Sequence, residues 1–170
     1  DTVVATTMSN MGLEDALGGM GLKLFRTQVG DKYVLEKMIE IGANLGGEQS
    51  GHVIFLDHNT TGDGLITALQ ILSIMKQNGK TLSELATCMR TYPQILKNVK
   101  VREKRDLATV PEISRRITQI ERELGGNGRL LVRYSGTEPK LRLLLEGREA
   151  AALDKWGARI IEAIRQQVGA

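Results

Sequence analysis

Short apolar segments alternate with segments of helical periodicity through residues 1–91, and this alternation limits the possible folds more than any other feature. Residues 2–6 are β-branched and apolar and predict a buried strand, whereas residues 22–27 alternate apolar with polar side chains and predict a second strand. Strands that alternate with helices are typical of α/β domains. Residues 31–41 predict a helix with four apolar side chains on one side: Val34, Leu35, Met38 and Ile39.

The rest of this first half continues the alternation. Residues 14–20 predict a short helix, residues 46–52 a loop and residues 53–56 a strand. A further helix begins at the capping box Thr81-x-x-Glu84. Between these elements, a helix is predicted from apolar residues at helical spacing, namely Leu65, Ala68, Leu69, Leu72 and Met75.

Tyr92-Pro93 interrupts the pattern, because proline does not continue a helix. The chain then runs strand, helix, strand, strand, helix, and the elements fall near residues 95–101, 109–124, 129–133, 141–145 and 150–167. The first of these helices is expected to begin with the capping box Thr109-x-x-Glu112, with Pro111 in its first turn, and to stop at the glycines that follow it. We predict a mixed-sheet α/β domain over residues 1–91, followed by a small α+β domain with an antiparallel sheet and two helices over residues 92–170.

The composition excludes several classes of protein. With 41% apolar and 25% charged residues, the 170-residue chain is not collagen-like, coiled-coil or intrinsically disordered. One cysteine, Cys88, excludes an intrachain disulfide and a cysteine-rich zinc site, and it fits a reducing cytoplasm. No apolar stretch approaches the roughly 18 residues of a membrane span, so no membrane is expected as a partner. A first residue other than Met suggests a fragment or a processed product.

The charges are distributed unevenly along the chain. Residues 1–96 hold 7 Lys and Arg against 10 Asp and Glu, whereas residues 97–148 hold 13 against 7. This change of sign supports a domain boundary and indicates that an anionic ligand would bind to the second domain. A solvated surface without a ligand is the alternative.

The segment from Arg133 to Pro139, Arg-Tyr-Ser-Gly-Thr-Glu-Pro, is the strongest candidate for a site. Gly136 is expected to let the backbone adopt an unusual turn and approach a ligand closely. Ser135, Thr137 and nearby backbone N–H groups can then point at phosphate oxygens, and Arg133 can add a bidentate, charge-assisted contact. A polar hairpin turn without a ligand is the competing interpretation.

A second candidate site lies in the loop predicted over residues 46–52. Glu48 and Ser50 place a carboxylate and a hydroxyl two residues apart, which suits the hydroxyl groups of a sugar. His52 follows closely and is a candidate for proton transfer. The competing interpretations are a capped turn for Glu48 and a structural role for His52.

Three aspartates near these loops have simpler explanations. Asp57-x-Asn59-x-Thr61-Gly62 resembles the start of a calcium loop, but Ala68 occupies the twelfth position, where a bidentate Glu is needed. Asp63, which lies between two glycines, is expected to shape the start of the following helix, and Asp31 is expected to cap the helix after it. Lys32 is then available for an anion. Asn59-Thr60-Thr61 matches a glycosylation pattern, but nothing in the sequence indicates secretion.

Taken together, these residues resemble the C-terminal half of an α-D-phosphohexomutase, and most closely the bacterial members that act on glucosamine phosphates. The likeness covers essentially the whole chain. The pair of motifs Gly-Glu-x-Ser-Gly-His and Arg-x-Ser-Gly-Thr-Glu-Pro, in this order, carries it most specifically. The chain departs from the family's pattern at Tyr134, because many members have proline after the arginine that corresponds to Arg133.

The resemblance implies four domains around a central cleft, of which this chain corresponds to the third and fourth. It implies that Glu48 and Ser50 bind sugar hydroxyls, with His52 beside them, and that Asp31 and Lys32 lie on the cleft wall. The residues implied to hold the phosphate that is not transferred are Arg133, Ser135, Gly136 and Thr137. Arg142, on the next strand, is expected to contribute less than Arg133.

The family's phosphoserine loop and Asp-Gly-Asp-Gly-Asp metal loop do not occur in this sequence. The resemblance therefore implies that Mg²⁺ binds elsewhere in the full-length enzyme, with its ligands outside this chain. It also implies a sugar phosphate substrate, a sugar 1,6-bisphosphate intermediate and the N-terminal half of the same polypeptide as partner. The implied role is in cell-wall amino-sugar precursor synthesis, and these 170 residues are expected to be inactive alone.

Two alternatives remain open. A mutase for glucose or mannose phosphates belongs to the same family, because the loop chemistry does not identify a 2-amino group. A nucleic-acid-binding module would use the basic stretch of residues 97–148. Aromatic residues make up only 4% of the chain, which leaves few side chains for base stacking and argues against nucleic acid as a partner.

Overall fold

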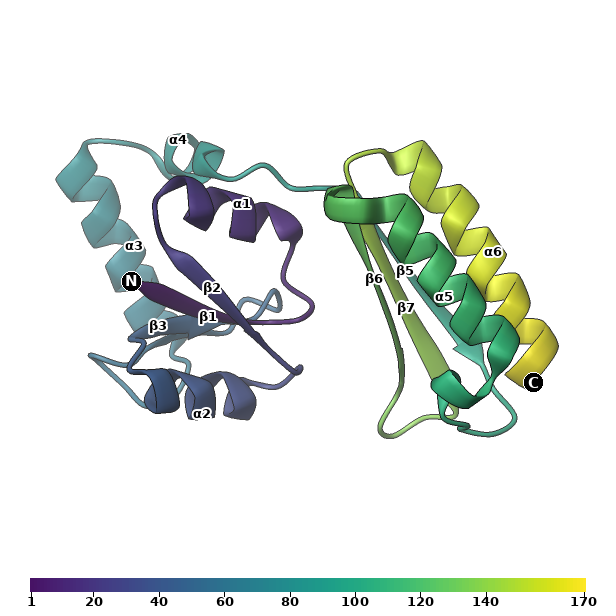
Figure 1. Ribbon diagram of the computed structural model, residues 1–170. Coiled ribbons are helices and arrows are strands. Elements are labelled where there is room, and N and C mark those ends of the chain that lie inside the picture. Colours follow the sequence, from purple (N-terminus) through teal and green to yellow (C-terminus); the bar gives the residue numbers. More distant parts are fainter. The chain divides into compact units, whose positions relative to one another are not determined.

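The computed structural model describes all 170 residues, and the chain divides into two compact units, Asp1–Thr91 and Tyr92–Ala170. Each unit has its own sheet and its own buried apolar cluster (Figure 1). The predicted class, a mixed-sheet α/β domain followed by an α+β domain with an antiparallel sheet, is confirmed. No helix of either unit is both long enough and apolar enough to cross a membrane.

The first unit contains a four-stranded sheet in the order β2-β1-β3-β4. Its strands are β1 (Thr2–Thr6), β2 (Lys23–Thr27), β3 (Leu45–Gly47) and β4 (Val53–Phe55). β1 pairs in parallel with both β2 and β3, and β3 pairs antiparallel with β4, which makes the sheet mixed. The predicted loop over residues 46–52 is shorter than expected, because Gly46 and Gly47 belong to β3.

The helices of the first unit are α1 (Met11–Gly19), α2 (Asp31–Ile41), α3 (Gly64–Asn78) and the short α4 (Leu82–Leu85), which continues into the 3-10 turn η1 (Ala86–Cys88). Figure 1 shows α1 and α2 on opposite sides of the sheet. α1 begins earlier than predicted because the Asn10 side chain accepts from Gly12 N and caps the helix. Asp63 and Thr81 cap α3 and α4 as predicted, but Asp31 does not cap α2, whose N-cap is Gly30.

The predicted apolar stripe of α3 faces away from the sheet except at Met75, which is half-buried. Leu65, Leu69 and Leu72 are 79%, 65% and 57% exposed, and α3 has no buried residue. The half-buried residues of this helix lie on its other side, where α3 packs near β4. Ile39 of α2, predicted on the buried side, is also exposed. The periodicity was sufficient to place these helices but gave the wrong inward face for α3.

The second unit has a three-stranded antiparallel sheet in the order β5-β7-β6. Its strands are β5 (Gln94–Lys100), β6 (Gly128–Tyr134) and β7 (Lys140–Gly147). Its helices are α5 (Pro111–Leu124) and α6 (Ala150–Val168). The 3-10 turns η2 (Leu107–Thr109) and η3 (Gly125–Asn127) precede and follow α5. Figure 1 shows α5 and α6 together on one face of the sheet.

The start of α5 differs from the predicted capping box. Its N-cap is Val110, which makes no side-chain cap bond, and Pro111 occupies the first turn as predicted. Thr109 instead donates from its hydroxyl to Asp106 O within η2. Glu112 pairs with Arg115 and Arg116 on α5. The sequence pattern for a capping box was therefore present at a helix start that does not use it.

The two faces of the second sheet differ in chemistry. Leu141, Leu143 and Leu145 of β7 are fully buried in the cluster formed with α5 and α6. The residues that alternate with them, Arg142, Leu144 and Glu146, lie on the opposite face, because side chains alternate along a strand. Glu146 is fully buried, and its carboxylate accepts from Gln94 Nε2 of β5 at 2.9 Å and from Arg129 Nε of β6 at 2.5 Å. This carboxylate therefore links all three strands.

Candidate functional site

The topology of the first sheet marks one edge as a binding position. β1 lies between two parallel neighbours, so the chain connects to β2 on one side and to β3 on the other. In open α/β sheets, ligands bind beyond the carboxyl ends of strands at such a switch point. The segments that leave these ends are residues 7–10 after β1, 28–30 after β2 and 48–52 after β3. The predicted sugar-binding loop is the last of these three.

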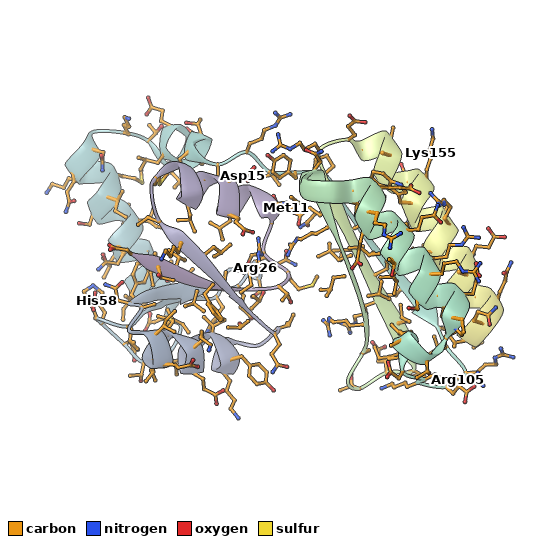
Figure 2. All side chains as sticks on the ribbon, in the orientation of Figure 1. Met11, Asp15, Arg26, His58, Arg105 and Lys155 are labelled. Atoms are coloured by element: carbon orange, nitrogen blue, oxygen red, sulfur yellow. The ribbon has the colours of Figure 1, made fainter.

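Arg26 holds the segment that follows β1. Its guanidinium donates to Ser9 O at 2.7 Å and to Thr6 O and Asn10 O at 3.4 Å, and it pairs with Glu14. Figure 2 shows Arg26 on β2. The sequence gives no local signal of these contacts, because Arg26 lies 16 to 20 positions after the carbonyls that it holds.

Glu48 joins the loop after β3 to the turn after β2. Its Oε1 accepts from Gly30 N at 2.9 Å, and Ser50 Oγ donates to its Oε2 at 3.4 Å. The loop closes on itself through Glu48 N to His52 O and Gly51 N to Glu48 O. One carboxylate oxygen is thus engaged with the backbone, and the other faces the hydroxyl of Ser50.

His52 lies against the turn that precedes α3. A Cβ at Gly62 would come within 2.2 Å of His52 Nε2, so only glycine fits beside this ring. The Nε2 atom is buried without a hydrogen bond and lies 3.5 Å from Asp31 Oδ2. His52 also lines an open depression of about 330 Å³, together with Ser50, Asp63 and Thr67.

The structure thus brings together most of the candidate residues of the first unit. Glu48, Ser50, His52 and Asp31 form one cluster through the contacts above. Lys32 does not join it, because its ammonium lies 3.7 Å from Glu36 on the exposed side of α2. The second group of candidates, around Arg133, belongs to the other compact unit.

Arg133 ends β6 beside another arginine. The register pairs Arg133 with Arg142 of β7, so both side chains leave the same face of the sheet, the face away from α5 and α6. Arg133 is half-buried and makes no hydrogen bond or ion pair with the protein. Like charges in direct cross-strand positions repel each other, and a bound anion relieves that repulsion. The sequence does not show that Arg142 lies opposite Arg133, because the register across a five-residue loop is not visible in the sequence.

The loop between β6 and β7 is held by a small number of hydrogen bonds. Ser135 N donates to Lys140 O at 2.8 Å, and the buried Ser135 hydroxyl accepts from Glu138 N and from Arg142 Nη2, each at 3.4 Å. No protein group accepts a hydrogen bond from the backbone N–H of Gly136 or Thr137. Gly136 and Thr137 are both exposed.

Gly136 does not adopt the unusual turn predicted for it. Its φ angle is not positive, and a Cβ at this position would meet no atom within 4 Å. The protein's own conformation therefore does not require glycine here. A glycine without an internal steric reason is consistent with the close approach of something outside the protein.

Glu138 is the acidic residue of this loop, and its partners are Lys140 and Arg142. It pairs with Lys140 at 2.5 Å and with Arg142 at 3.4 Å. The hydrogen bond from Lys140 is the main cause that lowers the pKa of Glu138, and Arg142 lowers it further. The carboxylate is therefore charged at neutral pH and partly neutralises Arg142, whereas Arg133 forms no ion pair.

The residues present do not fit a metal ion. Nowhere in the chain do three or more His, Cys, Asp or Glu side chains gather in a way that would hold one. Asp63 instead caps α3, and Asp57 accepts from Asn44 Nδ2 at 2.7 Å. The sites in both units are thus built from neutral donors, arginines and single carboxylates.

Comparison with protein families gives a match to each unit. Residues 1–92 match the family described as phosphoglucomutase/phosphomannomutase, alpha/beta/alpha domain III. Residues 96–163 match phosphoglucomutase/phosphomannomutase, C-terminal domain.

Curated relatives are similar over almost the whole of this chain. The phosphoglucosamine mutase of Geobacter metallireducens is 53% identical over 169 residues, which are 99% of this chain and 38% of the relative. That of Desulforamulus reducens is 52% identical over 169 residues, again 99% of this chain and 37% of the relative. The chain therefore spans less than two fifths of the length of these relatives.

Solved structures of low sequence identity share the fold. An N-acetylphosphoglucosamine mutase of Aspergillus fumigatus, in complex with GlcNAc-6P and magnesium, matches with a TM-score of 0.79 at 20% identity, over 98% of this chain and 39% of that one. The phosphoglucomutase parafusin of Paramecium matches with a TM-score of 0.73 at 17% identity, over 98% of this chain and 38% of that one. With both units matched by its domain models and relatives above half identity, this chain belongs to the phosphoglucomutase/phosphomannomutase family, the α-D-phosphohexomutases.

Proposed function

We propose that this chain is the substrate-binding, C-terminal portion of a phosphoglucosamine mutase, which interconverts glucosamine 6-phosphate and glucosamine 1-phosphate. The names of relatives at 52–53% identity support the glucosamine substrate. In this proposal, the first unit binds the sugar through the loop after β3. The second unit holds the phosphate that is not being transferred through the loop after β6.

One observation carries the proposal: the loop after β6 is cationic and rich in hydrogen-bond donors, and its arginine Arg133 has no acidic partner. Arg133 and Arg142 lie side by side on one face, and Arg133 makes no ion pair. The adjacent N–H groups of Gly136 and Thr137 are free to donate. A phosphate dianion supplies both the charge and the acceptor oxygens that this arrangement lacks.

The loop after β3 suits a sugar that binds in two orientations. The mutase reaction moves a phosphoryl group from a phosphoserine to the free hydroxyl of a sugar monophosphate, and after reorientation of the bisphosphate the serine takes back the other phosphoryl group. The Oε2 of Glu48 and the hydroxyl of Ser50 can accept and donate to sugar hydroxyls in either orientation. Such positioning supplies a large part of catalysis in phosphoryl transfer.

The phosphoserine and the magnesium ion of this reaction would come from residues outside this chain. The chain forms no metal cluster of its own, so no step is assigned to a metal held by these residues. Its own contribution is to bind the sugar phosphate and to orient the reacting hydroxyl. The N-terminal portion of the longer polypeptide is the partner that this proposal requires.

The first test uses the chain by itself. We expect the 170-residue protein not to convert glucosamine 6-phosphate to glucosamine 1-phosphate, because it lacks the group that gives and takes the phosphoryl group. ³¹P NMR of the reaction mixture measures this directly. Turnover at a rate near that of a full-length mutase would contradict the assignment of the chain as a binding portion.

The second test concerns the substrate and uses a longer enzyme that contains this chain. We expect kcat/KM for glucosamine 6-phosphate to exceed that for glucose 6-phosphate and mannose 6-phosphate. The reverse order would make the protein a mutase of the same family for neutral sugars. A salt-dependent affinity for RNA or DNA stronger than that for sugar phosphates would instead support a nucleic-acid-binding module.

The two glycines Gly136 and Gly128 offer a further prediction with an internal control. In Gly136→Ala the new methyl group meets no protein atom, so stability should stay within about 0.5 kcal/mol of the wild type. The same methyl group would lie where a phosphate must approach, so KM should rise. In Gly128→Ala the Cβ would lie 2.5 Å from Glu146 O, so this variant should lose stability. Thermal melts and steady-state kinetics of both variants check the prediction, and an unchanged KM in Gly136→Ala would contradict it.

A further inference from the structure

We propose that Lys104 is a positioning residue for the phosphate-binding loop, which it holds from behind through two backbone carbonyls. The proposal rests on the function proposed above for this loop. Lys104 Nζ donates to Ser135 O at 2.6 Å and to Gly136 O at 3.3 Å. No other side chain in the second unit contacts two consecutive carbonyls of this loop.

Because the peptide group is planar, these two contacts determine the direction in which the N–H groups of Gly136 and Thr137 point. In a planar trans peptide, the C=O and the N–H of the same unit point in opposite directions. The carbonyl of Ser135 shares its peptide with the N–H of Gly136, and the carbonyl of Gly136 shares its peptide with the N–H of Thr137. Because both carbonyls point toward Lys104, both N–H groups point away from it.

Successive N–H groups that point to the same side form a concave site for an anion. Neither of these N–H groups donates within the protein, so the pair is available to a ligand. An ammonium bound to the carbonyls also polarises the two peptides and makes their N–H groups stronger donors. Lys104 therefore favours the loop conformation that binds phosphate before any phosphate arrives.

The position of Lys104 is itself fixed by its surroundings. It lies between β5 and η2, in a segment where Val101 N donates to Pro139 O and Arg102 N donates to Val168 O. Its neighbours Glu103 and Arg105 pair with each other at 2.6 Å, so no carboxylate competes for the ammonium. Figure 2 shows Arg105 at one end of the second unit and Lys155 at the other, which provides a distant lysine as a control.

The test compares Lys104→Met, Lys104→Arg and the matched control Lys155→Met. In ¹⁵N NMR of the ligand-free chain, the amide signals of Gly136 and Thr137 should move in Lys104→Met and stay in place in Lys155→Met. In the longer enzyme that contains this chain, Lys104→Met should raise KM for glucosamine 6-phosphate about tenfold, with a smaller change in kcat. Lys104→Arg should recover most of this loss, because a guanidinium can also donate to two carbonyls.

The outcomes separate this inference from the function on which it rests. If Arg133→Ala raises KM and Lys104→Met leaves both KM and the free-state amide signals unchanged, the role of Lys104 is overturned and the phosphate loop stands. If Lys104→Met raises KM without moving the free-state signals, the lysine contacts the ligand directly and the positioning role is overturned. Equal losses in Lys104→Met and Lys104→Arg, with a lower melting temperature by Trp156 fluorescence, would show support of folding instead. A wild-type KM in Arg133→Ala would remove the phosphate-binding function itself.

Discussion

Replacement of Arg133 by Ala in the longer enzyme should lower kcat/KM about a hundredfold or more while the fold stays intact. The arginine lies near the end of β6, is half-buried and makes no hydrogen bond or ion pair with the protein that its removal would break. A charge-assisted contact to a phosphate dianion is worth roughly 2–4 kcal/mol, which corresponds to a loss of this size. Steady-state kinetics with glucosamine 6-phosphate measure it, and circular dichroism checks the fold.

Two further variants sharpen this prediction. Arg133→Lys should recover only part of the loss, because an ammonium does not make a bidentate contact with phosphate. Arg142→Ala should cost less than Arg133→Ala, because Glu138 already neutralises part of the Arg142 charge in the free protein. A wild-type kcat/KM in Arg133→Ala would remove the role of this loop as phosphate anchor. Full recovery in Arg133→Lys, with equal losses in Arg133→Ala and Arg142→Ala, would instead mean that net charge, and not geometry, determines binding.

Replacement of Arg129 by Met should lower the free energy of unfolding of the second unit by about 3–5 kcal/mol. Glu146 is fully buried, and its carboxylate accepts from Arg129 Nε and from Gln94 Nε2. Removal of Arg129 takes away a cation that donates to this buried carboxylate, and the loss of such a partner from a buried charge is costly. The chain has 1 Trp, Trp156 on α6, so tryptophan fluorescence during denaturant unfolding reports on the second unit alone.

The control for this prediction removes both partners. The double variant Arg129→Met with Glu146→Leu should recover much of the lost stability, because apolar residues of similar volume replace a buried ion pair at little cost. Arg122→Met, on the exposed side of α5, removes an arginine that makes no hydrogen bond or ion pair and should change stability by less than about 1 kcal/mol. A single Arg129→Met variant as stable as the wild type would show that Glu146 does not depend on this arginine.

The sequence was sufficient to predict elements whose signals are local. Asp63 and Thr81 cap α3 and α4, and Pro111 opens α5, because capping depends on residues within one turn of each other. The order of strands and helices in both units also followed from local periodicity. The two loop motifs that indicate the family are local as well, because each is a contiguous run of residues.

Other local signals were misleading where a nearby element competes for the same groups. Asp31 has the residue type of a helix cap, but Gly30 occupies that position, and Asp31 lies beside His52 instead. Thr109 has the pattern of a capping box, but its hydroxyl donates within the preceding 3-10 turn. In α3, both sides of the helix carry apolar residues, so periodicity alone did not identify the side that packs near β4.

The candidate sites show the same division between local and tertiary information. The residue types of both loops follow from the sequence, because they are contiguous. Only the tertiary structure placed Gly30 N–H on Glu48, Arg142 opposite Arg133 and Lys104 on the carbonyls of the phosphate loop. Each of these contacts joins residues at least nine positions apart, and their distance in space depends on strand register and on how loops pack. A linear sequence contains the groups that make such contacts, whereas the folded chain determines which of them meet.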